Sequence, residues 1–83
     1  LLPDEIGGAY RVLFNYLVKT YKLSKNITPR ELLNIIKDKN PNISSDLEFI
    51  TNIHEKYTYK KSDIDNMVKT EYFETVKKVL REI

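Results

Sequence analysis

The sequence predicts an all-α fold, a compact bundle or orthogonal array of four helices. Apolar residues recur at spacings of three and four through most of the 83 residues, and helix-start signals precede several of these runs. No stretch alternates apolar and polar residues for long enough to predict a strand. The helices are expected at about residues 4–22, 29–39, 45–58 and 63–82.

The composition is that of one folded domain. Hydrophobic residues make up 41% of the chain and charged residues 31%, with only two Gly and three Pro, so long loops are not expected. The absence of Cys excludes disulfides, thiolate metal ligands and a cysteine nucleophile. The apolar runs are far shorter than the ~20 residues of a transmembrane helix. Because the first residue is Leu1, the chain is expected to be a piece excised from a longer protein or a processed form of one.

The first helix is predicted from one apolar face. Gly7 and Gly8 weaken its first turn, so the helix is expected to start near Ala9, with Asp4 as a cap upstream. Residues at helical spacing form the face: Ile6, Tyr10, Leu13, Phe14, Leu17 and Tyr21.

The second helix has the strongest start signal in the chain. Thr28 and Glu31 have the spacing of a reciprocal capping box, in which each side chain accepts a hydrogen bond from the backbone N–H of the other. Pro29 falls at the first helical position, which it favours. Arg30 is not needed for capping, so we expect it to form a salt bridge, with Glu55 as the candidate partner, or a contact outside the domain.

Two further caps are predicted for the remaining helices. Ser45 and Glu48 have the spacing of a second capping box, and Ser62 is the expected cap of the last helix. The third helix is expected to bury Leu47, Ile50, Ile53, His54 and Tyr57.

The chain has no recognisable catalytic or metal-binding pattern. His54-Glu55 begins like a zinc-protease motif, but that motif needs a second His where Thr58 stands, and His54 is the sole histidine. We therefore expect a half-buried helix histidine packed near Tyr57. The paired carboxylates lie at expected helix N-termini, where the helix dipole accounts for them. The sequence thus predicts a protein that is not an enzyme, with no cofactor, no metal and no evident small-molecule substrate.

The charge balance argues against nucleic acid without eliminating it. Fourteen Lys and Arg against twelve Asp and Glu give a net charge of +2, whereas nucleic-acid binders concentrate positive charge. The alternative hypothesis is a helix-turn-helix domain that binds nucleic acid, with residues 45–57 as the recognition helix. That helix would carry Glu48, Glu55 and only Lys56. The six tyrosines are expected mainly at the boundary of the core, and an exposed tyrosine patch would suit a protein partner.

The order of these signals resembles a known family. Ala9-Tyr10-Arg11 is followed by the box of Thr28, Pro29, Arg30 and Glu31, and then by residues 53–60, which include Glu55 and Tyr59. The chain resembles, from about residue 10 to 80, the uncharacterised C-terminal domain of membrane-anchored transglutaminase-like proteins, a family of unknown function.

The resemblance implies a setting rather than an activity. It implies a domain that follows a transmembrane segment of its parent and lies on the cytoplasmic face of the membrane. It carries over no catalytic residue, cofactor or ligand; only Thr28–Glu31 and the pair Glu55 and Tyr59 transfer, as structural signatures. The expected function is that of a non-enzymatic accessory domain for interaction or regulation, whose partner is another protein or the rest of the parent. A small nucleic-acid-binding domain is the alternative.

Overall fold

The computed structural model describes residues 2–60 and 64–83, except for the side chains of residues 59 and 60. The order of elements is α1 (Ile6–Thr20), α2 (Pro29–Lys39), a short 3₁₀ helix η1 (Pro41–Ile43), α3 (Ser44–Lys60) and α4 (Asn66–Glu82). Within the described ranges there is no strand. The predicted all-α fold of four main helices is confirmed.

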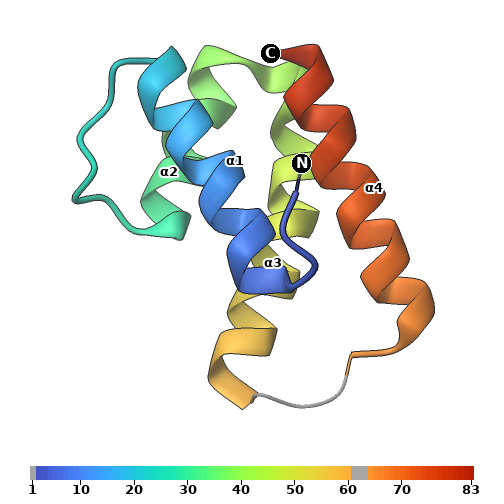
Figure 1. Cartoon of the computed structure of the whole chain (residues 1–83). Helices are drawn as coiled ribbons and strands as arrows, with labels where there is room; N and C mark the ends of the chain where they lie inside the picture. The colour runs from blue at the N-terminus through green and yellow to red at the C-terminus, as the bar shows by residue number, and fades with distance from the viewer. Residues whose placement is uncertain (1, 61–63) are drawn as a thin grey trace.

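The helices are arranged around α3 (Figure 1). This helix contacts α1, α2 and α4, and α1 also packs against α4. The short helix η1 connects α2 to α3 and contacts both. The first turns of α1 and α2 lie on the same side of the molecule as the C-terminal half of α3 (Figure 1).

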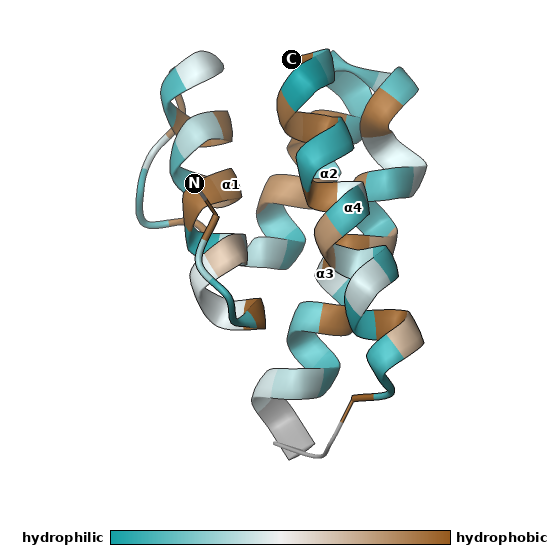
Figure 2. Cartoon of the chain, turned by 45° about the vertical axis from the view of Figure 1, so that its right-hand side comes forward, coloured by the Kyte–Doolittle hydropathy of each residue, from teal (hydrophilic) through white to brown (hydrophobic). Residues whose placement is uncertain are grey.

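One apolar core joins all four helices and η1. Figure 2 shows apolar residues recurring along each helix with hydrophilic residues between them, as amphipathic helices require. Each fully buried Leu or Ile stabilises the fold by about 1.5–3 kcal/mol relative to an exposed one. The core residues are Ile6, Ala9, Tyr10, Leu13, Leu17, Leu32, Leu33, Ile36, Ile43, Leu47, Ile50, Tyr72, Val76 and Val79.

The ends of α1 differ from the prediction. The helix begins at Ile6, so Gly7 and Gly8 lie inside it, and its N-cap residue is Glu5 rather than Asp4. The side chain of Glu5 makes no capping hydrogen bond. At the other end, Lys22 adopts a left-handed backbone with φ of 55°, and the N–H of Leu23 donates to the Val18 carbonyl. Glycine is the usual residue at this position, so a lysine there is not recognisable as a helix end from the sequence.

The second predicted capping box is wrong. Because η1 runs directly into α3, Ser45 already lies within the helix and cannot cap it. Glu48 instead pairs with Lys37 of α2 at 3.5 Å. The N-terminal neighbour Ser44 donates its hydroxyl to the Pro41 carbonyl.

The start of α4 also lies later than predicted. The helix begins at Asn66, and the N-cap is Asp65, whose carboxylate accepts a hydrogen bond from the Met67 N–H at 2.8 Å. An aspartate at this position satisfies one of the free N–H groups of the first turn. The prediction that Ser62 caps this helix falls outside the described residues.

Candidate functional site

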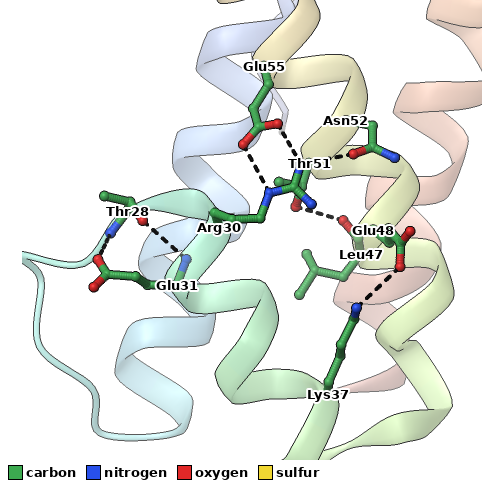
Figure 3. A network of polar contacts seen from close by, with 9 residues as sticks. All are labelled: Thr28, Arg30, Glu31, Lys37, Leu47, Glu48, Thr51, Asn52 and Glu55. Atoms are coloured by element: carbon green, nitrogen blue, oxygen red, sulfur yellow. Dashed lines mark hydrogen bonds and ion pairs between the residues drawn. The ribbon is translucent and has the colours of Figure 1, made fainter.

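The predicted capping box at the start of α2 forms. The Glu31 N–H donates to Thr28 Oγ1 at 3.1 Å, and the Thr28 N–H donates to Glu31 Oε1 at 2.8 Å. Pro29 occupies the first helical position, as expected. These contacts fix where the chain enters α2 and therefore where the next side chain, Arg30, points (Figure 3).

Arg30 connects α2 to α3. Its guanidinium donates to both carboxylate oxygens of Glu55, from Nε at 3.2 Å and from Nη2 at 2.5 Å. The same Nη2 donates to Asn52 Oδ1 at 3.0 Å, one turn earlier on α3 (Figure 3). This two-bond pairing specifies the geometry between the two helices, because a planar guanidinium matches a carboxylate in only a few orientations. The expected salt bridge with Glu55 is therefore present.

The pairing shifts both pKa values. The hydrogen bond with Glu55 raises the pKa of Arg30, and the hydrogen bond with Arg30 lowers the pKa of Glu55. The side chains remain 46% and 34% exposed, so solvent screens the charge attraction. We conclude that this contact contributes more to the alignment of the helices than to overall stability.

A stacked pair of rings lies next to this contact. The ring of Tyr10 on α1 stacks on the imidazole of His54 on α3, with centroids 4.1 Å apart and planes within 10°. The expected neighbour Tyr57 is instead 36% exposed, so the prediction of an inward Tyr57 is wrong. His54 is half-buried as predicted.

Two polar atoms of the stacked pair are buried without a hydrogen bond. Tyr10 is 4% exposed, and neither its Oη nor His54 Nδ1 has a partner among the described residues. Burial raises the pKa of the Tyr10 phenol and lowers that of His54, in the latter case against a smaller opposing effect of Glu55. Burial therefore favours the neutral form of both rings.

A groove opens beside the stacked rings. It has a volume of about 720 Å³ and lies between the first half of α1, the end of the α1–α2 connection and the C-terminal half of α3. A second hollow of about 330 Å³ borders the Arg30–Glu55 contact and shares Pro29 and His54 with the first. We call the larger one the α1–α3 groove; its lining residues are Pro3, Glu5, Gly7, Gly8, Tyr10, Arg11, Val12, Phe14, Lys25, Ile27, Pro29, His54 and Tyr57.

The structure brings together most, not all, of the residues singled out in the sequence. Arg30 meets Glu55 across the α2–α3 contact, and Thr28, Pro29 and Glu31 form the helix start that precedes and follows it. Tyr59 lies in α3, but its side chain is outside the described residues. The contact of Asn52 and the stacking of Tyr10 on His54 were not predicted, since no sequence pattern links positions so far apart in the chain.

No metal centre can be built from the part of the chain that is described. There, no three His, Asp or Glu side chains lie close enough together to hold an ion. Among the described helices, none combines the length and apolar character needed to cross a bilayer.

The fold and the site define a small all-α domain with an arginine–glutamate contact beside a shallow groove. Comparison of the chain with protein-family models, with curated proteins and with solved structures found no match.

Proposed function

We propose that this chain is a non-enzymatic helical accessory domain that acts by binding a protein segment, from a separate partner or from its own parent. The α1–α3 groove is the observation that supports this proposal. Val12 and Tyr57 are 38% and 36% exposed at the groove, and Tyr16, one turn beyond Val12 on α1, is 43% exposed. Tyrosine is enriched in protein interfaces, so exposed tyrosines at and near a concave surface favour a protein-binding site.

The setting of the domain is a further part of the proposal. The resemblance of residues 28–31 and 55–59 to the transglutaminase-associated family favours a membrane-anchored parent, with this domain on the cytoplasmic face. In that setting the groove would hold a regulatory segment of the parent or of a protein beside it.

The helix-turn-helix alternative receives less support from the packing. Its recognition helix would be α3, which contacts all three other main helices. The acidic Glu48 and Glu55 of α3 form ion pairs with Lys37 and Arg30, and they would face any phosphate backbone that approached this side.

Site-specific cross-linking tests the interaction proposal. A photoreactive phenylalanine analogue replaces Tyr57 in the full-length parent, and the matched control places it at exposed Glu71 on α4. We expect one reproducible adduct from position 57, identified by mass spectrometry, and its loss when Val12→Asp is added. Equal adducts from both positions, or none from position 57, would refute the proposal. Carbonate extraction and protease protection of the parent test the membrane setting separately.

A further inference from the structure

Gly7 is a helix residue whose missing side chain serves no contact within the described chain. A Cβ built at Gly7 would meet no atom within 4 Å. Gly8 is different, because its Cβ would lie 2.7 Å from Pro3 Cβ, so packing alone accounts for that glycine. Glycine inside a helix weakens it relative to alanine. Since Gly7 lines the α1–α3 groove, its open position leaves room for a backbone from outside the chain.

The charges around the groove favour an anionic occupant. Arg11 and Lys25 are exposed lining residues, and neither takes part in an ion pair within the described ranges. The first turn of α1 also lies at the groove, and it has neither a side-chain cap nor an acidic residue. Its free N–H groups add a partial positive charge. Glu5 opposes these groups as the single acidic residue among the described lining residues.

The rest of the lining is apolar. Phe14, Ile27 and Pro29 are half-buried, and Val12 and Tyr57 are exposed. This surface can accept a large aliphatic or aromatic side chain. An occupant therefore needs an apolar side chain and carboxylates in the same short segment.

We propose that the α1–α3 groove binds an acidic protein segment in which a large apolar side chain is flanked by carboxylates. The apolar side chain packs against Phe14, Ile27 and Tyr57, and the carboxylates pair with Arg11 and Lys25. The backbone of the segment passes over Gly7. This inference rests on the proposed function, because it names the chemistry of the partner that the groove would receive.

Nuclear magnetic resonance of the ¹⁵N-labelled domain tests the inference directly. Gly7 and Gly8 are the two glycines of the chain, so their amide signals are easily assigned reporters of the groove. The probes are the peptides Asp-Glu-Leu-Phe-Asp-Glu, Lys-Lys-Leu-Phe-Lys-Lys and Asp-Glu-Ser-Ser-Asp-Glu, and a thymidine oligonucleotide. We expect the first peptide to shift both glycine signals and those of His54 and Tyr57, and the other probes to bind about tenfold more weakly or not at all.

Four variants sharpen the test. Arg11→Gln should weaken binding of the acidic apolar peptide about fivefold, whereas Arg81→Gln, at an exposed arginine near the end of α4, should leave it unchanged. Glu5→Gln should strengthen binding because it removes the opposing charge. Gly7→Ala should weaken binding about fivefold while the thermal midpoint stays the same or rises, since alanine favours the helix.

Several results would overturn the inference. These are no glycine shift with the acidic apolar peptide, equal affinity for the basic peptide or the oligonucleotide, or equal effects of Arg11→Gln and Arg81→Gln. Its failure can be separated from that of the proposed function. A reproducible cross-link from position 57, without acidic-peptide binding, would sustain an interaction domain and reject an acidic segment as its partner.

Discussion

The guanidinium of Arg30 in the first turn of α2 donates to both carboxylate oxygens of Glu55, which lies 25 residues later on α3. This contact joins the helix start at Thr28 to the helix that touches every other one. Arg30 and Glu55 line the smaller hollow, and their chain neighbours Pro29 and His54 line both hollows. The orientation of α2 relative to α3 therefore depends on a pair of residues whose chain neighbours line the groove.

The Arg30–Glu55 contact is expected to show a measurable coupling energy. In a double-mutant cycle with Arg30→Ala and Glu55→Gln, the two losses of unfolding free energy should not add. Arg30→Lys should behave almost like Arg30→Ala, because lysine keeps the charge but not the two-bond geometry. Urea unfolding supplies the free energies.

The control for this cycle is the pair of Lys37 and Glu48. Its side chains are 46% and 49% exposed, but it has a single contact at 3.5 Å, so its coupling should be smaller. Because pairing lowers the pKa of Glu55, the Arg30–Glu55 coupling should be full above the ordinary glutamate pKa and disappear as pH falls through the lowered value. Coupling that is equal in the two pairs, or unaffected by acid, would contradict the structural interpretation.

His54 is expected to make stability depend on pH in a defined direction. Burial lowers its pKa in the folded state below 6.5, so the unfolded chain binds the proton more readily. The free energy of unfolding should therefore be highest above pH 6.5 with respect to this group and should fall as pH drops from 6.5 to the folded pKa. Since His54 is the sole histidine, its imidazole proton signals report the folded pKa without overlap.

His54→Gln provides the comparison for that measurement. The variant should lose the part of the pH dependence that lies just below 6.5. Among the groups around His54, the pKa of Glu55 is lowered and the pKa values of Arg30 and Tyr10 are raised, in each case away from this window. A folded-state pKa above 6.5 would show that the imidazole is not desolvated by its stacking on Tyr10.

Two buried tyrosines should respond differently to removal of their hydroxyl groups. Tyr72 is fully buried, and its hydroxyl donates to the Ile6 carbonyl at 3.0 Å. Tyr72→Phe leaves that carbonyl without this donor and should lower the free energy of unfolding by about 1–3 kcal/mol. Tyr10→Phe removes a buried hydroxyl that has no described partner, so stability should be unchanged or higher.

Each of these two variants is a control for the other, because both remove one hydroxyl group from a tyrosine of the same core. Chemical denaturation of each variant and of the unsubstituted domain measures the difference in the free energy of unfolding. Equal destabilisation by both would mean that the Tyr10 hydroxyl has a hydrogen-bond partner in solution.

The capping box should contribute to stability independently of binding. Thr28→Ala removes the acceptor of the Glu31 N–H and should cost roughly 0.5–2 kcal/mol. Thr70→Ala, at an exposed position within α4, is the control and should have little effect. If Thr28→Ala left stability unchanged but weakened binding in the groove, the box would belong to the binding surface rather than to the helix start.

Helix capping and helical spacing depend on residues a few positions apart, and the features that follow from them were predicted correctly for most of this chain. The capping box at Thr28 and Glu31 forms from side chains three residues apart, and the buried faces follow helical spacing. The same rules failed at Ser45, because η1 places that residue inside a helix that has already begun. They also failed at Lys22, where the chain uses a left-handed lysine in place of glycine.

The sequence by itself determined the all-α fold and the position of α2, and it indicated that Arg30 is free to form a salt bridge because capping does not require it. Only the tertiary structure decided that Tyr10 stacks on His54, that Tyr57 is partly exposed at the groove and that Gly7 lines the same groove. The physical reason is that spacing and capping energies act within one helix, over a few residues. The site is made where three helices meet, and their relative orientation depends on how all the core side chains pack together.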